Sequence, residues 1–229
     1  MKKISPIIFA RMSSSRLPGK MLMDICGKPL FLHVLERARA IRGVDDVILA
    51  TSIDKSDDEL VEFAKDCKVK VFRGSLENVA KRAIDCAVLN DLDAFIRICG
   101  DRPFFDPNMI DSMLLKYRKY KPDIATNAQF KTYPAGMTVE IISTQSLIKA
   151  FKCMVNELDK EHITQFFYQN TDLFKIYNKS WNSPKEALLS FVIDTKLDLD
   201  KARWIAFQIK DRGILPMEEM IALIKIWKK

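Results

Sequence analysis

The feature that most constrains the fold is a regular alternation between short apolar runs and helical patterns through residue 127. Runs rich in β-branched residues, typical of buried strands, occur at 4–10, 47–51, 69–72, 94–99 and 123–126. Apolar residues at helical spacing follow from Pro29, from Ser56, and over 76–89 and 108–120. Strands that alternate with helices build a parallel sheet covered on both faces, so the sequence predicts a doubly wound, mostly parallel, Rossmann-like α/β fold.

The alternation is less regular after residue 127. Strands are expected at 137–143, 173–176 and 188–193, and helices at 145–156, 162–170, 199–209 and 217–227. We expect one domain over residues 1–229, in which about 128–187 form an irregular inserted α+β subdomain. Near the start of the second helix, Ser56 and Glu59 have the spacing of a capping box.

The composition favours a soluble globular protein, because 48% of residues are hydrophobic and 29% are charged. The apolar runs are shorter than the roughly 18 residues of a membrane helix, and the run before Arg11 is too short for a signal peptide, so a cytoplasmic location is expected. Five cysteines without a Cys-x-x-Cys pair and two histidines disfavour a zinc or redox site. The net charge of +7 suggests an anionic partner, or solvation alone.

The most informative segment is the loop after the first strand, Ala10 to Lys20. It combines three cations, Arg11, Arg16 and Lys20, with three consecutive serines at 13–15. Backbone N–H groups and hydroxyls in such a loop can surround a polyphosphate while the cations neutralise its charge. The Walker and Gly-x-Gly-x-x-Gly spacings are absent. The loop therefore predicts a phosphate site of another kind, with a solvated basic loop as the alternative.

Two carboxylates also follow predicted strands. Asp101 comes after the strand at 94–99, and Asp194 comes after the apolar residues at 191–193. Oxygen ligands at strand ends near a triphosphate suit Mg²⁺, although Asp194 could also be a turn residue. For Asp198 and Asp200 a helix-capping role is expected instead.

Three motifs stand in order near the start of the chain: Ala10-Arg-x-x-Ser-x-Arg-Leu-Pro-Gly-Lys20, Gly27-Lys-Pro-Leu30 and His33-Val-Leu-Glu-Arg37. They resemble the opening of the cytidylyltransferases that make CMP-activated sugar acids, the CMP-Kdo and CMP-sialic acid synthetases. The spore-coat-polysaccharide-type branch is the most similar, and the resemblance spans residues 4 to about 207.

The resemblance implies roles for the loop and the carboxylates. Arg11 and Lys20 would hold the triphosphate of CTP, supported by Ala10, Ser14 and Arg16, and Asp101 and Asp194 would bind Mg²⁺. Arg11, Lys20 and Asp101 would be the catalytic residues. The chain departs from the family pattern after Asp194, where 196–198 read Lys-Leu-Asp in place of Pro-Glu-Asp.

Further segments resemble the family's base and acceptor sites. The implied cytosine site comprises Arg73, Gly74, Ser75, Asn78 and Arg82, although Asn78 and Arg82 also fit a solvated helix surface. The residues implied near the acceptor sugar or the dimer contact are Tyr133, Gly136, Glu140, Glu161 and His162. His162 also fits a structural hydrogen-bonding role at a helix start.

The resemblance thus implies a Mg²⁺-dependent, homodimeric enzyme that transfers CMP from CTP to a sugar-acid hydroxyl, releasing pyrophosphate, in surface polysaccharide or glycan biosynthesis. The sugar acid would be a 3-deoxy-2-ulosonic or nonulosonic acid, and residues 128–187 would bind it and form the dimer contact. One alternative is a related enzyme that uses another nucleotide, or a sugar-phosphate or phosphonate acceptor.

A second alternative is a non-catalytic module that binds nucleic acid. It requires a contiguous basic face with interleaved aromatic residues. The basic residues are instead spread along the helices, and Lys225, Lys228 and Lys229 are expected on a solvated end. We therefore expect neither nucleic acid nor membrane among the partners.

Overall fold

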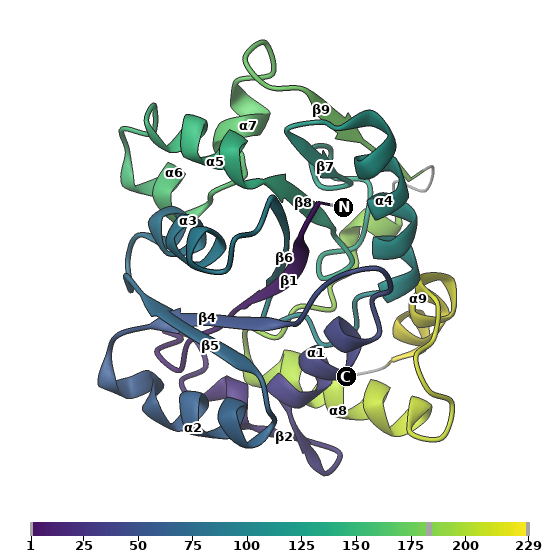
Figure 1. Ribbon diagram of the computed structural model, residues 1–229. Coiled ribbons are helices and arrows are strands. Elements are labelled where there is room, and N and C mark those ends of the chain that lie inside the picture. Colours follow the sequence, from purple (N-terminus) through teal and green to yellow (C-terminus); the bar gives the residue numbers. More distant parts are fainter. Residues whose placement is uncertain (1, 182–184, 228–229) are drawn as a thin grey trace.

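The protein is built around one central sheet. The computed structural model describes residues 2–181 and 185–227, and in this part the strand order is β5-β4-β1-β6-β8-β7-β9 (Figure 1). All of these strands run parallel except β8, which is antiparallel to both of its neighbours. The strand bounds are β1 Ile4–Phe9, β4 Ile48–Ser52, β5 Lys70–Gly74, β6 Ala94–Cys99, β7 Ile124–Thr126, β8 Glu140–Ser143 and β9 Ile176–Asn178.

Helices cover both faces of the sheet (Figure 1). One core contains residues of α1 Leu30–Arg39, α2 Asp58–Asp66, α4 Pro107–Tyr120, α8 Lys196–Ile209 and α9 Met217–Ile226. The other contains residues of α3 Val79–Leu89, α5 Thr144–Phe151 and α7 Gln165–Gln169, and α6 Glu157–Glu161 contacts α3. Short 3-10 turns occur at Lys20–Leu22, Lys55–Asp57 and Glu186–Leu188, and a small hairpin joins β2 Asp24–Ile25 to β3 Lys28–Pro29.

Strand β1 shows why both faces are covered. Ile4 and Ile8 belong to the first core, whereas Ile7 and Phe9 belong to the second. Successive side chains of a strand point to opposite faces, and a strand that is apolar on both faces needs cover on both. The predicted doubly wound, mostly parallel α/β fold is confirmed.

The segment 128–187 contributes to the same sheet. Its strand β8 lies between β6 and β7, and β9 forms the outer edge beside β7. The reversed direction of β8 places its first residue, Glu140, at the edge where β6 ends, because Ile96 pairs with Ile141 and Ala94 with Ser143.

Apart from shifts of a few residues, such as the strand predicted at 173–176 that forms at Ile176–Asn178, local structure departs from the predictions in three places. Residues 188–193 form no strand but a single bridge between Ser190 and Ala135. This run is apolar because Phe191 is buried against Phe104, where it packs outside the sheet. The predicted helix at 162–170 begins only at Gln165, after the separate helix α6.

The third departure concerns helix caps. Ser56 is not a cap, because its backbone N–H donates to the carboxylate of Asp54 at the preceding turn. A capping box occurs instead between Thr195 and Asp198 at the start of α8, which confirms the capping role expected of Asp198. Asp200 lies within α8 and pairs with Arg203.

No helix among the described residues is long and apolar enough to cross a bilayer. Lys228 and Lys229, expected on a solvated end, lie outside the described ranges.

A buried carboxylate fixes the loop that follows β1. Asp57 is fully buried and accepts hydrogen bonds from the Met12 N–H at 2.7 Å, the Thr51 hydroxyl at 2.8 Å and both the N–H and hydroxyl of Ser52 at 3.0 and 2.5 Å. Burial acts to raise the pKa of Asp57, but these hydrogen bonds outweigh it and hold the pKa below its usual value. Asp57 thus joins the loop after β1 to the end of β4.

Replacing Asp57 with alanine removes the acceptor of these donors, so Asp57→Ala is expected to lower the free energy of unfolding by about 2–4 kcal/mol near neutral pH. Because the folded-state pKa is depressed, this stabilisation is present above the unfolded pKa, about 4, and is lost as pH falls through the folded pKa. Urea denaturation at several pH values measures the difference between the two proteins.

The matched control is Asp66→Ala, at an exposed position near the end of α2, for which a change within about 0.5 kcal/mol is expected. Equal stability of Asp57→Ala and the wild type at neutral pH would contradict the anchoring role.

Candidate active site

The carboxyl ends of β1 and β6 border a cleft of about 360 Å³. In a parallel α/β sheet this edge is where ligands bind. The cleft brings together residues from well-separated parts of the chain. The sequence-predicted residues that line it are Ala10, Arg11, Ser14, Arg16, Lys20, Arg82, Asp101, Glu161, His162 and Asp194.

Lys20 lies at the centre of the charged groups in this cleft. Its ammonium donates to the Ile193 carbonyl at 2.7 Å, to Asp194 Oδ1 at 3.1 Å and to Asp101 Oδ2 at 3.4 Å. The residue is 7% exposed, so these contacts replace most of its hydration. Gly19, which has φ +72°, makes the left-handed turn that precedes it. The two predicted metal ligands therefore converge on one ammonium group.

Each of these carboxylates faces a second cation. Arg16 Nη2 lies 2.9 Å from Asp194 Oδ2, and Arg102 Nε lies 4.0 Å from Asp101 Oδ1. Arg11 lines the cleft as well. Cationic side chains outnumber carboxylates in the lining of the cleft. Such an excess of positive charge attracts polyanions such as a triphosphate.

The donor chemistry of Asp101 and Asp194 fits Mg²⁺. Among residues 2–181 and 185–227, no cluster of three or more His, Cys, Asp or Glu side chains forms a metal site made entirely of protein ligands. Mg²⁺ is usually held by one or two carboxylates together with substrate phosphates and water. Two converging carboxylates beside a cationic loop match that donor set.

Close packing holds the two halves of the cleft together. A Cβ added to Gly100 would lie 2.7 Å from Ala10 Cβ and 2.8 Å from Met21 Cε. The Gly100 N–H also donates to the Phe9 carbonyl at 2.9 Å. Glycine is needed here because the end of β6 contacts the loop after β1 directly.

Arg82 is buried, which excludes the expected alternative of a solvated helix surface. Its Nη1 donates to the Ser75 carbonyl at 2.5 Å and the Leu76 carbonyl at 3.2 Å, while its buried Nε has no partner among the described residues. Burial and the like charge of Arg11 lower the pKa of Arg82 to about 10. Arg82 fixes the loop at 74–78 and faces the cleft.

The other residues of the implied base site lie outside the cleft lining. Asn78 caps α3 by accepting from the Lys81 N–H at 2.8 Å, and its own N–H donates to the Ser75 hydroxyl at 3.0 Å. Arg73 donates to the Asp58 carboxylate at 2.6 Å and to two backbone carbonyls. These contacts hold the backbone around Gly74 in place.

Part of the implied acceptor site forms a second cavity, of about 230 Å³. Tyr133, Gly136 and Glu140 line it together with Arg102 and Lys131. Gly136 has φ +90°, and an added Cβ would lie 3.0 Å from Phe191 Cβ, so glycine is required there. Glu161 and His162 lie in the first cleft, and thus the structure divides the implied acceptor residues between two hollows.

Glu140 forms a buried ion pair. Its Oε2 accepts from Arg97 Nη1 at 2.6 Å and its Oε1 accepts from the Tyr168 hydroxyl at 2.9 Å. Burial acts to raise the pKa of Glu140, but the charges of Arg97 and then Arg102 outweigh it, and the pKa lies below its usual value. Arg97 also lines the cleft, and sequence reasoning missed it. Its signal was a lone charge within the apolar strand at 94–99.

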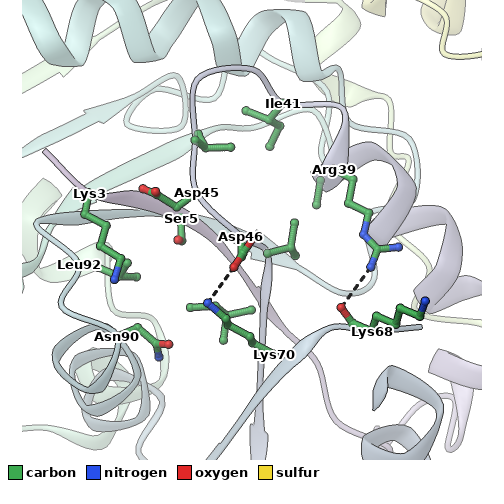
Figure 2. A pocket seen from close by; sticks show the side chains of 14 residues that line it. Lys3, Ser5, Arg39, Ile41, Asp45, Asp46, Lys68, Lys70, Asn90 and Leu92 are labelled. Atoms are coloured by element: carbon green, nitrogen blue, oxygen red, sulfur yellow. Dashed lines mark hydrogen bonds and ion pairs between the residues drawn. The ribbon is translucent and has the colours of Figure 1, made fainter. Parts of the chain in front are cut away.

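A larger cavity, of about 480 Å³, lies at the opposite edge of the sheet, at the amino ends of β1, β4 and β5 (Figure 2). Many of its charged groups are already partnered. Lys70 pairs with Asp46 at 2.8 Å, and Arg39 donates to the Cys67 carbonyl at 2.6 Å. None of the predicted site residues lines it, so the cleft at the carboxyl ends is the candidate active site.

Comparison with known proteins identifies the family of this chain. A family model described as cytidylyltransferase matches residues 6–222. The chain belongs to the cytidylyltransferase family. The resemblance recognised in the sequence and the expected enzyme class, nucleotidyltransferase, are thereby confirmed.

Individual relatives show how far the similarity extends. The solved structure of a cytidylyltransferase from Leptospira borgpetersenii has a TM-score of 0.91 and 27% identity, covering 98% of this chain and 94% of that one. The spore coat polysaccharide biosynthesis protein SpsF of Bacillus subtilis is 28% identical over 98% of this chain and 95% of its own. A 3-deoxy-manno-octulosonate cytidylyltransferase of Escherichia coli is 38% identical over 50% of this chain and 46% of its own.

The buried pair generates a prediction for this cytidylyltransferase. Arg97→Met leaves Glu140 buried without its cation and is expected to lower the free energy of unfolding by about 3–5 kcal/mol near pH 7. In the variant an unpaired, buried Glu140 has a raised pKa. The difference in free energy of unfolding between the variant and the wild type therefore shrinks as pH falls towards about 4. Chemical denaturation across this pH range measures it.

The matched control is Arg212→Met, which removes the exposed ion pair with Glu219 and should cost under about 1 kcal/mol. If Arg97→Met lowers the free energy of unfolding only slightly, or by an amount independent of pH, Glu140 is not left as a buried, unpaired carboxylate.

Proposed function

We propose that this cytidylyltransferase transfers CMP from CTP to the hydroxyl of a sugar acid and releases pyrophosphate, with Mg²⁺ as cofactor. The observation that carries the proposal is the convergence of Asp101 and Asp194 on Lys20, beside the cationic loop at the carboxyl ends of β1 and β6. The E. coli relative is named for 3-deoxy-manno-octulosonate, and SpsF for spore coat polysaccharide biosynthesis. We extend the sugar-acid substrate and the role in surface polysaccharide synthesis to this chain.

The loop after β1 binds the triphosphate in this proposal. Arg11, Arg16 and Lys20 neutralise the phosphate charge, and Ser14 and the backbone at Ala10 add hydrogen-bond donors. Phosphoryl transfer needs little beyond positioning and charge stabilisation, which preorganised cations supply. The Asp57 anchor keeps this loop in place before the nucleotide binds.

Asp101 and Asp194 hold the metal in this proposal. When bound, Mg²⁺ neutralises phosphate charge and lowers the pKa of a coordinated hydroxyl. Lys20, bonded to both carboxylates, orients them and balances their charge. Because a hydroxyl with a lowered pKa loses its proton readily, the proposal requires no separate general base.

The cytosine ring is assigned to the loop after β5. Gly74 and Ser75 present backbone groups to the base edge, and Arg73, Asn78 and Arg82 fix the backbone that carries them. The acceptor lies on the other side, towards Glu161 and His162 in the cleft and Tyr133, Gly136 and Glu140 in the second cavity. We assign acceptor binding and a homodimer contact to residues 128–187.

The test is a matrix of nucleotides and acceptors, with pyrophosphate release as the readout. CTP, UTP, ATP and GTP are each combined with 3-deoxy-2-ulosonic acids, nonulosonic acids, sugar phosphates and phosphonates, with and without Mg²⁺. Turnover of CTP with a sugar acid supports the proposal. Turnover confined to another nucleotide or to a sugar phosphate would replace it with the related-enzyme alternative.

The central ammonium generates a further prediction. Lys20→Met removes a cation of the cleft that neutralises developing phosphate charge in this proposal, so kcat/KM should fall by the equivalent of about 2–4 kcal/mol. Asp101→Asn should abolish metal-dependent pyrophosphate release. Steady-state kinetics measure both effects, and circular dichroism verifies the fold.

Two exposed positions on α2 serve as controls, Lys65→Met and Asp66→Asn, which should leave kcat/KM unchanged. If Lys20→Met retained wild-type kcat/KM, Lys20 would be a structural cation with no part in catalysis.

A further inference from the structure

Arg102 has unused hydrogen-bonding capacity beside the candidate active site. It follows Asp101 directly, and its Nη1 donates to the Thr138 hydroxyl at 2.5 Å. Its Nε is buried without a hydrogen-bond acceptor among the described residues, 4.0 Å from Asp101 Oδ1. A guanidinium offers several N–H donors in a planar fork, and buried donors normally have partners. The Arg102 side chain is 23% exposed and lines the second cavity, so the guanidinium can face an anionic ligand there.

The second cavity has a positive charge that its own residues do not cancel. Arg102 and Lys131 line it, and the one carboxylate in the lining, Glu140, is paired with Arg97. Tyr133 lines it too, and its hydroxyl is buried without a partner in the described part of the chain. A hollow of about 230 Å³ with free cationic and polar groups suits a small polar anion.

Arg102 lines this cavity, and its chain neighbour Asp101 lines the cleft, with 4.0 Å between Arg102 Nε and Asp101 Oδ1. A small void is lined by Arg102 and Thr138 together with Arg97 and Cys99, and the latter two residues also line the cleft. An acceptor hydroxyl placed beside Asp101 therefore brings a neighbouring group on the same molecule within reach of Arg102. The rest of that molecule would extend towards Tyr133.

We propose that Arg102 determines acceptor specificity by binding an anionic group next to the attacking hydroxyl, with the body of the acceptor in the second cavity. This inference rests on the proposed function and adds the group that the acceptor must carry. A guanidinium fork binds carboxylate and phosphoryl oxygens alike. We commit to the carboxylate of a sugar acid, and the test contains a phosphate arm.

The test measures binding without turnover. The wild type, Arg102→Met and Arg102→Lys are titrated calorimetrically with 3-deoxy-manno-octulosonate, with its carboxamide and with glucose 1-phosphate. The wild type should bind the acid about 10–100-fold more tightly than the amide, since a charge-assisted hydrogen bond is lost with the amide. Arg102→Met should reduce that preference to within about twofold, and Arg102→Lys, which keeps the charge, should restore part of it.

Arg212→Met, at an exposed position, is the control and should keep the full preference. Thermal melting of each variant separates loss of binding from loss of fold, and Thr138→Val, which removes the hydroxyl partner but keeps the guanidinium, should retain the preference for the acid. The proposal is overturned if Arg102→Met keeps the full preference for the acid over the amide, or if the wild type shows no such preference. Tighter, Arg102-dependent binding of glucose 1-phosphate overturns the assignment to a carboxylate.

A different result would contradict the proposed function, namely that no sugar acid gives pyrophosphate release. Because the titration requires no turnover, the binding role of Arg102 and the reaction can be judged separately.

Discussion

The arrangement of the cleft depends on one buried ammonium group. Lys20 reaches the Ile193 carbonyl and the carboxylates of Asp101 and Asp194, so three segments of the chain, including its own, meet at one ammonium group. A buried cation is costly unless all of its donors are satisfied, so its three partners must be held at fixed positions. The Ile193 N–H donates in turn to the Asp101 carbonyl at 3.0 Å, which ties two of these segments together. The carboxylates are thus positioned by the protein itself.

Two buried carboxylates, Asp57 and Glu140, each have their own hydrogen-bonding partners. Asp57 is satisfied by neutral hydrogen-bond donors, whereas Glu140 is satisfied by Arg97 and Tyr168. Asp57 fixes the loop after β1, which lines the cleft, and the pairing of Glu140 fixes the start of β8, which lines the second cavity. Arg102 differs from them because much of its fork remains unpartnered among the described residues. Arg82 and Arg97 also each have an Nε without a partner among the described residues, but unlike Arg102 neither of them lines the second cavity.

The sequence was sufficient to predict the parallel half of the sheet and the residues at its carboxyl edge. Arg11, Lys20 and Asp101 follow strands whose β-branched runs are clear, and parallel strand ends meet at one edge. The run before Asp194 was equally apolar, yet it packs outside the sheet. An apolar run records burial, and burial under a loop leaves the same pattern as burial in a sheet.

The pairing of Arg97 with Glu140 could not be predicted in this way. It depends on the register of β8 against β6, two strands that are 43 residues apart at this contact and antiparallel. Register follows from packing of whole elements, and the short strand β8 carries too little pattern to specify it. The role of Arg73 was hidden for a similar reason, because its partners lie on a neighbouring strand and turn.

The single reversed strand has a consequence for how this architecture can change. Because β8 runs against β6, the chain enters β8 at the edge where the parallel strands end, and the connection from β7 to β8 lines the second cavity. That connection includes Lys131, Tyr133 and Gly136, but none of the partners of Lys20. Insertions or deletions there can reshape the second cavity while the phosphate-facing groups stay in place, since loops tolerate changes in length better than strands do. The reversal separates the part of the site that can diversify from the part that must stay constant.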